Sequence, residues 1–364
     1  MSLQKKINKL QRDPKLFFKD MFLKKYIPIK NKAKTITPKK NNGYSKYVIV
    51  SAVYNVEKYL NDYFNSIINQ RLDFKNNIHI ICVDDGSSDN SAKIIKHYQK
   101  KYPKNITYIY KENGGQASAR NLGLKLLQED PNLKDKFTWV TFTDPDDFLD
   151  RDYFYEVDEF LAKNRDNSIS MVACNLIFYF EKHETYKDTH PLKFKFQENI
   201  TILPNSNLNK NIQLSAATAF INLNTIKNTK QIKPIFNEEI PNFEDAYFLN
   251  LILMQNLNQK SAFLKHSIYY YRKRKDGGST LDNIEAAYKK QLIKNGYLLL
   301  LLQNEELLQS IPVFTQQTIL YDLIWFIKDN INKDNFGFYS NEEKEELIAI
   351  LKQIYSKIDS KLIL

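Results

Sequence analysis

The chain has 364 residues, 43% of them hydrophobic, and a formal net charge of +11. All the excess charge lies in residues 1–40, which hold thirteen Lys or Arg against two Asp, whereas the other 324 residues carry 40 basic and 40 acidic side chains. A formally neutral body argues against nucleic-acid binding. No run in the sequence approaches the eighteen or so apolar residues that span a bilayer. The N-terminus also lacks a secretory apolar core and cleavage site, so a cytoplasmic or peripheral membrane protein is expected.

The N-terminal arm, residues 1–45, is basic and partly amphipathic. Its residues 16–23 include the apolar set Leu16, Phe17, Phe18, Met21, Phe22 and Leu23, interleaved with lysines. This composition is typical of a segment lying on an anionic membrane face. A solvated basic tail, or a helix packed on the body through its Phe residues, remains an alternative. Residues 26–42, with two prolines and many lysines, are predicted to be a linker.

The first strand and helix follow the arm. Tyr47–Val53 is a short, nearly all-apolar run rich in β-branched residues, which predicts a strand covered on both faces in a parallel sheet. From Leu60 onward, apolar residues recur at three- and four-residue spacing, which predicts a helix with one buried face.

Two further units repeat this pattern. Residues 78–83 are predicted to form a strand that ends in Asp84-Asp85-Gly86, followed by a helix, and residues 106–110 form a strand that ends before Asn113-Gly114-Gly115. Strands alternating with helices imply parallel crossovers. The carboxyl ends of these strands should therefore form one crevice, where open α/β sheets bind ligands.

The fourth predicted strand, Phe137–Phe142, leads into Thr143-Asp144-Pro145-Asp146-Asp147, which places three carboxylates within four positions. Hard oxygen ligands of this kind suit a divalent cation that holds a diphosphate. Acidic turns are also common without any metal. The two cysteines, Cys82 and Cys174, lie in apolar strand-like runs, which argues for core positions and against a zinc site or disulfide framework.

Four motifs in this order resemble the signature of family 2 inverting glycosyltransferases of the bacterial surface-polysaccharide type. They are Val50-Ser51-Ala52-Val53-Tyr54-Asn55, Val83-Asp84-Asp85-Gly86-Ser87-Ser88-Asp89, Asn113-Gly114-Gly115-Gln116-Ala117-Ser118-Ala119-Arg120-Asn121 and Asp144-Pro145-Asp146-Asp147. The resemblance is strong over residues 47–150 and weaker to about residue 280. It implies a GT-A fold, a Rossmann-like α/β domain with a mostly parallel sheet.

The resemblance also implies a donor site. Ala52, Tyr54 and Asp85 would line the base and ribose, and Gly115 and Arg120 would belong to the same site. The family's Asp-X-Asp motif falls on Asp144 and Asp146, with Asp146 as the expected metal ligand and Asp144 near ribose or metal. Mn²⁺ or Mg²⁺ would neutralise the departing diphosphate of a nucleotide sugar, most simply a UDP-sugar.

The second half of the chain supplies a candidate base. Phe243-Glu244-Asp245-Ala246 resembles the family's acidic pair at the start of a helix beneath the acceptor, with Asp245 as the base and Glu244 beside it. General-base catalysis typically contributes about 10²- to 10⁴-fold. The alternative is a first-turn acidic pair that stabilises the helix dipole by about 0.3–1 kcal/mol.

Residues 268–280 resemble a strand and loop that close over the diphosphate. Arg272 and Arg274 are predicted to contact phosphate, because arginine suits bidentate contact; the alternative is a charged edge strand. The loop is Asp276-Gly277-Gly278-Ser279-Thr280. His266 is a candidate for completing the metal shell, although a lone His more often makes a local structural hydrogen bond.

Three regions are therefore predicted. They are the arm and linker (1–45), a GT-A domain (46–280, divided into a nucleotide-sugar half, 46–150, and an acceptor half, 151–280) and a C-terminal helical region (281–364). Helices are predicted over 284–308, 313–331 and 347–354, the last with a capping box at Ser340 and Glu343.

The leading hypothesis is a hexosyl- or N-acetylhexosaminyltransferase. It would act on a hydroxyl of a capsule, lipooligosaccharide or other surface glycan, free or lipid-linked. Two alternatives stay open: a nucleotidyltransferase of similar fold, and a noncatalytic glycan-assembly scaffold. The first would normally carry a Gly- and basic-rich loop after the first strand, which Val53-Tyr54-Asn55 is not.

Overall fold

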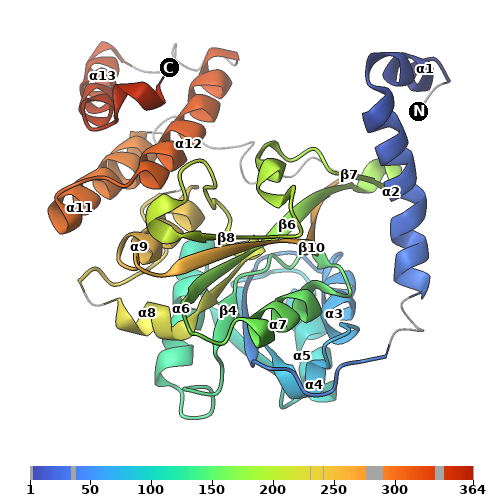
Figure 1. The fold of residues 1–364 in the computed structure, drawn as a ribbon. Helices are drawn as coiled ribbons and strands as arrows, with labels where there is room; N and C mark the ends of the chain where they lie inside the picture. The colour runs from blue at the N-terminus through green and yellow to red at the C-terminus, as the bar shows by residue number, and fades with distance from the viewer. Residues whose placement is uncertain are drawn as a thin grey trace.

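The computed structural model describes residues 3–33, 38–229, 231–240, 242–275, 290–332 and 340–363. Within them, one mixed sheet runs through the molecule in the order β3-β2-β1-β4-β9-β6-β10-β5, with β7 paired to β6 and β8 paired to β10. Helices cover both faces of this sheet (Figure 1). The architecture is the α/β sheet expected from the sequence.

The first four strands form the parallel half of the sheet. Their bounds are β1 Tyr47–Val53, β2 Ile78–Asp85, β3 Ile106–Lys111 and β4 Trp139–Thr141, with helices α3 Leu60–Ile68, α4 Phe74–Asn77, α5 Ser91–Lys101 and α6 Gln116–Glu129. Alternate residues of β1 enter different cores: Val48 and Val50 face the cluster under α6, and Ile49 faces the cluster under α3. Because both faces of β1 are covered, its sequence is almost continuously apolar.

Gly123 brings α6 close to the sheet. A Cβ at this position would lie 2.3 Å from Val50 Cγ1, so only glycine allows the helix to approach β1 this closely. The start of α6 is thereby fixed against the carboxyl ends of the parallel strands. Cys82 and Cys174 are both buried and unpaired, as the sequence predicted.

The second half of the sheet is mixed. Its elements are β5 Phe148–Leu149, α7 Tyr153–Lys163, β6 Ile169–Phe180, η1 Glu181–His183, β7 Thr185–Lys187, η2 Pro191–Phe196, β8 Ile200–Pro204, η3 Asn205–Asn207, η4 Ala216–Thr218, β9 Ala219–Asn222, α8 Leu223–Asn228, α9 Glu244–Met254 and β10 Lys260–Lys273. Strand β9 runs antiparallel between β4 and β6, and β10 runs parallel to β6. This arrangement places the end of β10 beside the acids that follow β4.

The C-terminal region is helical. It comprises η6 Leu292–Leu298, α11 Leu299–Leu308, α12 Val313–Asn332, α13 Asn341–Ser356 and η8 Ser360–Leu362. The capping box at α13 is present, with Ser340 and Glu343 each accepting from the other's backbone N–H. Residues 284–289 of the first predicted helix lie outside the described residues. The segment η6 is a π-helix, which the sequence did not indicate.

These helices pack on α9. The ring of Phe243, which precedes α9, meets the ring of Tyr297 edge-on at 4.9 Å between centroids. Tyr247 Oη donates to Gln303 Oε1 at 2.7 Å. The helical region therefore braces the start of α9.

Two helices precede the sheet, α1 Leu3–Arg12 and α2 Pro14–Ala33. The predicted linker from Tyr26 is wrong over residues 26–33, because α2 continues through Pro28. Ile27 is only 3% exposed and packs with Leu23 against Ile177 and Tyr270. This packing supplies tertiary stabilisation that a sequence pattern does not reveal. Among the described residues, no helix is both long and apolar enough to cross a membrane.

Candidate active site

The acidic turn after β4 is anchored from below. Thr143 is buried; its carbonyl accepts from Ser51 Oγ at 2.8 Å and its hydroxyl bonds Tyr63 Oη at 2.9 Å. Ser51 lies on β1 and Tyr63 on α3, so two elements of the parallel half fix the start of the turn. The three carboxylates that follow are positioned at the carboxyl edge of the sheet, as expected.

Each carboxylate of the turn has a different environment. Asp147 is buried, and it accepts from Tyr269 Oη at 2.7 Å and from the Arg272 backbone N–H at 2.6 Å. Burial, followed by the charges of Asp146 and Asp144, raises the pKa of Asp147 well above its usual range. Asp147 therefore ties the turn to β10 and is unsuited to bind a substrate.

Asp146 is more open and faces an arginine. Its Oδ2 accepts from Arg274 Nε at 2.9 Å and lies 2.6 Å from Arg274 Nη2. Arg272 supports the same turn from behind, because its Nε donates to the Asp146 carbonyl at 2.7 Å and its Nη2 donates to Asp62 at 3.0 Å. Of the two predicted phosphate contacts, Arg274 stands in the site, and Arg272 is buried in a structural ion-pair network with Asp62 and Glu181.

Arg120 connects the acidic turn to α9. Its side chain is 1% exposed, and it forms ion pairs with Asp144 (Nη2 to Oδ1, 2.9 Å), with Glu244 (Nη1 to Oε1, 3.3 Å) and with Asp245. Three carboxylates from two distant parts of the chain thus converge on one buried guanidinium. Breaking such a buried cluster by removing its cation is costly, because the remaining charges lose their partner.

Charge crowding changes the protonation equilibria of this cluster. Burial raises the pKa of Asp144 to about 7, with Arg120 opposing the shift and Asp146 adding to it. Burial and the neighbouring Asp245 raise the pKa of Glu244. Burial and the neighbouring carboxylates thus favour the neutral forms of Asp144 and Glu244, and a cation bound nearby would favour their ionised forms.

Asp245 and Glu244 occupy the first turn of α9, as predicted. Asp245 Oδ2 accepts from the Ala216 backbone N–H at 2.8 Å, while Oδ1 pairs with Arg120. Phe243, immediately before the pair, has φ +70°, a left-handed conformation that is strained for a bulky side chain. The backbone is thus held in an unfavourable geometry directly beside the candidate base.

A buried lysine supports the loop that holds Asp245. Lys195 Nζ donates to the Ile212 carbonyl at 2.5 Å and to Gln213 Oε1 at 2.9 Å, and Gln213 in turn donates to the Ser215 carbonyl and Thr218 hydroxyl. Burial lowers the pKa of Lys195 to about 7. This support was not predicted from the sequence, where its one signal is a lysine between two phenylalanines, Phe194 and Phe196.

The predicted nucleotide residues lie along the same edge. Tyr54 follows β1 and is 52% exposed, and Ala52 is half-buried. Asp85 is buried and accepts from Lys111 Nζ (2.6 Å) and from the backbone N–H groups of Gly114 (2.9 Å) and Gly115 (2.8 Å). In this structure Asp85 therefore shapes the glycine turn, while the Tyr54 ring remains available for stacking.

One predicted metal ligand does not lie among the acids. His266 is exposed on β10, and its Nε2 bonds Asn199 Oδ1 at 3.1 Å, which is the local structural role weighed from sequence. The loop over residues 276–280 lies outside the described residues. Within the described part of the chain, no group of three His, Cys, Asp or Glu residues is arranged to hold a metal by itself.

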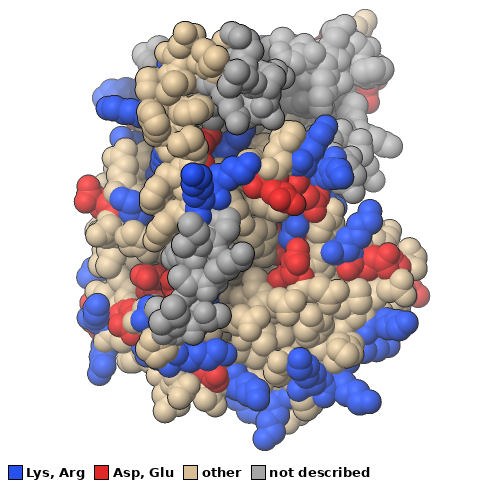
Figure 2. All heavy atoms as spheres, turned by 90° about the vertical axis from the view of Figure 1, so that its right-hand side faces the viewer, with Lys and Arg blue, Asp and Glu red and all other residues tan. Residues whose placement is uncertain are grey.

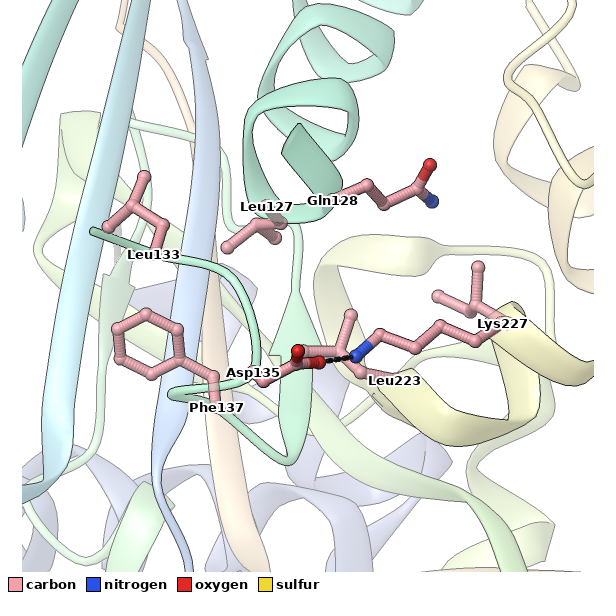
Figure 3. A pocket seen from close by; sticks show the side chains of 8 residues that line it. Leu127, Gln128, Leu133, Asp135, Phe137, Leu223 and Lys227 are labelled. Carbon is pink, nitrogen blue, oxygen red and sulfur yellow. Dashed lines mark hydrogen bonds and ion pairs between the residues drawn. The ribbon is translucent and has the colours of Figure 1, made fainter. Parts of the chain in front are cut away.

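Two cavities lie away from the carboxyl edge of the parallel strands. The hollow in Figure 3 is lined by apolar residues of α6, of α8 and of the segment that follows α6, and by the Asp135–Lys227 ion pair; at about 10 Å³ it has room for about one water. A second cavity of about 220 Å³ includes Ser45 and Trp139, at the opposite, amino ends of the parallel strands. Neither cavity is lined by Asp144, Asp146, Asp245 or Arg120.

The fold matches solved glycosyltransferases. The structure of S. aureus TarS residues 1–349 in complex with UDP-GlcNAc superposes with a TM-score of 0.62 at 19% identity, covering 87% of this chain and 82% of that one. The mannosyltransferase PcManGT from Pyrobaculum calidifontis, in complex with GDP-Man and Mn²⁺, superposes with a TM-score of 0.51 at 12% identity, covering 94% and 96%. The chain thus has the GT-A fold of nucleotide-sugar transferases.

Sequence comparison gives the family. Residues 48–222 match the family model described as "Glycosyl transferase family 2". The minor teichoic acid biosynthesis protein GgaB of Bacillus subtilis (strain 168) is 33% identical over 326 residues, which is 87% of this chain; the match spans only about a third of GgaB. The chain belongs to glycosyltransferase family 2.

Proposed function

We propose that the protein is an inverting glycosyltransferase that moves a hexosyl or N-acetylhexosaminyl group from a nucleotide donor to a hydroxyl of a bacterial surface glycan. UDP is the favoured nucleotide, since the S. aureus neighbour was solved with UDP-GlcNAc. The name of GgaB supports an acceptor of the teichoic acid class. The expected setting is the inner face of the cytoplasmic membrane, with the protein bound peripherally.

One observation carries this proposal. Arg120 gathers Asp144, from the donor end of the sheet, with Glu244 and Asp245, from the acceptor end. Glycosyl transfer requires a diphosphate-binding group and a base on either side of one anomeric carbon, and this cluster brings candidates for both to one place. A noncatalytic scaffold would have no need for that convergence.

Asp245 is the proposed base. Arg120 and the Ala216 N–H orient its carboxylate, and each carboxylate oxygen retains a second lone pair for an acceptor hydroxyl. Accepting that proton as the hydroxyl attacks would contribute about 10²- to 10⁴-fold to the rate. Glu244 and Arg120 remain beside it, so the proton moves within a fixed charge cluster.

Asp146, with Asp144 nearby, is the proposed holder of Mn²⁺ or Mg²⁺. Burial, and after it the charge of Asp146, raises the pKa values of Asp144 and Asp147, and a bound cation would favour their ionised forms. Such a cation would neutralise charge on the departing diphosphate. Arg274, which pairs with Asp146, would contact the same phosphates, and the exposed Tyr54 ring would stack on the base.

The test uses a panel of nucleotide sugars. Thermal stabilisation and Mn²⁺-dependent donor hydrolysis are measured for the wild type and for Asp146→Ala, Asp245→Asn and the exposed control Asp166→Asn. We expect Asp146→Ala to abolish metal-dependent donor binding. Asp245→Asn should retain donor binding and lose at least about 10²-fold in donor hydrolysis, in which the sugar is transferred to water. Donor hydrolysis that survives Asp245→Asn would show that another group is the base.

A further inference from the structure

Helix α2 has apolar side chains on two opposite faces. Leu23 and Ile27 pack on the body, whereas Phe18, Met21, Phe22 and Tyr26 are exposed, Phe18 by 57% and Phe22 by 60%. Large exposed apolar side chains grouped on one surface usually mark an interaction site. We propose that this outer face of α2, together with Lys15 and Lys25, docks on an anionic lipid surface.

The spacing of these residues makes them one surface. Positions 15, 18, 22 and 25 recur at three and four residues, so Lys15, Phe18, Phe22 and Lys25 share one side of the helix. Leu23 and Ile27 lie on the opposite side, where they are held by the body. Phe22 also stacks on Tyr26 with 4.8 Å between ring centroids. The outer face therefore presents aromatic rings flanked by ammonium groups.

The attachment of α2 to the body keeps this face outward. Ile27 is buried against Ile177 and Tyr270, and Lys19 forms an ion pair with Asp188 beside β7. Figure 1 shows α2 lying along one edge of the molecule next to β7. Because these contacts use the inner face, turning the aromatic rings inward would require undoing them.

Charge complementarity identifies the partner as anionic. Residues 1–40 carry a net charge of +11, which is all of the chain's excess positive charge. Figure 2 views the side of the molecule on which α1 and α2 lie, and Lys and Arg side chains are spread across it, interspersed with Asp and Glu. Each basic residue near an anionic bilayer contributes to attraction, and inserted aromatic and aliphatic side chains add burial in the interface.

The aromatic rings decide between lipid and a soluble polyanion. A phosphate-rich polymer would be bound by lysines alone and would leave Phe18 and Phe22 in water. A lipid surface uses both components at once, as interfacial helices do. The inference deepens the peripheral placement in the proposed function, and because its test measures lipid binding without any sugar substrate, either proposal can fail separately.

The test is co-sedimentation of the full-length protein with phosphatidylcholine vesicles and with vesicles that also contain phosphatidylglycerol. We expect the protein to bind the anionic vesicles and added salt to weaken this binding. The double variant Phe18→Ser, Phe22→Ser should bind at least about tenfold more weakly than the wild type. The matched control Ile200→Ser, Ile202→Ser changes two exposed apolar residues of β8 and should bind normally. Lys15→Glu with Lys25→Glu should weaken binding, whereas Lys134→Glu with Lys136→Glu should not.

A second readout follows the helix directly. Since both native cysteines are buried, Phe18→Cys provides a single reactive site for an environment-sensitive dye. Its emission should shift to the blue with anionic vesicles. Unchanged emission, or equal binding by wild type and the Phe18→Ser, Phe22→Ser variant, would overturn the proposal. Two other outcomes would do the same: binding to soluble polyphosphate but not to vesicles, or a wild-type dimer that this variant converts to a monomer.

Discussion

The two halves of the sheet position their functional side chains by different means. In the parallel half, Tyr54, Asp85 and Asp144 each lie at or just beyond the carboxyl end of a strand, and the strand positions them at the crevice. In the mixed half, Asp245 depends on Arg120 and on the Ala216 N–H, while Arg274 depends on Asp146. Local sequence order thus determines one side of the site, and contacts between distant segments determine the other.

Substitution of Arg120 should have the largest effect, because its side chain links the parallel half of the sheet to the mixed half. Arg120→Leu leaves Asp144, Glu244 and Asp245 without their shared cation and should lower the free energy of unfolding by about 3–5 kcal/mol. Urea unfolding at neutral pH measures this loss, with exposed Arg165→Leu as the control. A loss under about 1 kcal/mol would mean that the halves are held together without this cluster.

Substitution of Lys195 affects only the mixed half, where contacts between distant segments position Asp245. Its pKa is lowered by burial to about 7 from an ordinary 10.5, so the unfolded chain binds more protons between these pH values. Lys195 should therefore increase the free energy of unfolding as pH rises from about 7 to 10. The increase should be at most about 1.4 kcal/mol per pH unit. Lys195→Met should remove that slope.

The same variant should also change catalysis, because Lys195 supports the loop that orients Asp245. We expect Lys195→Met to lower kcat more than it raises the KM for donor. Exposed Lys193→Met on the same short helix is the matched control and should leave both the slope and kcat unchanged. A flat pH dependence in the wild type would contradict the assigned environment of Lys195.

Substitution of Gly115 affects the parallel half, where the local sequence positions the predicted donor residues. Its φ of +89° and ψ of 165° lie in a region essentially restricted to glycine, although a Cβ there would meet no atom within 4 Å. Gly115→Ala should cost about 1–3 kcal/mol through backbone strain and should raise the KM for donor. Glu112→Ala, an exposed neighbour, serves as the control in calorimetry and donor titration. An unaffected Gly115→Ala would show that this turn relaxes freely.

The smallest effect is expected at a helix cap far from the crevice. Ser340→Ala removes one partner of the capping box and should cost about 1 kcal/mol in the free energy of unfolding. Ser356→Ala, at the other end of α13, should be nearly neutral. Equal effects at both ends would show that local capping does not determine the stability of α13.

The sequence predicted those features that obey local rules. Tyr47–Val53 matches β1 at both ends, because a strand buried on both faces is written as an unbroken apolar run. The Ser340 box and the helix start at Glu244 follow from capping and charge at helix ends. The acidic turn was predicted because three carboxylates within four positions, directly after a strand, suit a divalent cation.

What the sequence did not predict depends on tertiary contacts. The continuation of α2 past Pro28 requires the packing of Ile27, and the structural network around Arg272 requires Asp62 and Glu181 from other elements. His266 was a plausible ligand by residue type, yet its neighbour Asn199 is set by the pairing of β8 with β10. The convergence on Arg120 could not be derived from spacing along the chain.

Phe243 links the C-terminal region to the acidic pair at the start of α9. Its strained backbone directly precedes Glu244 and Asp245, its ring rests on Tyr297, and Tyr297 Oη donates to Asp322 Oδ2 at 2.5 Å. Substitutions on η6 or α12 can therefore reach the candidate base without touching it. Directed-evolution libraries confined to the crevice would overlook those positions.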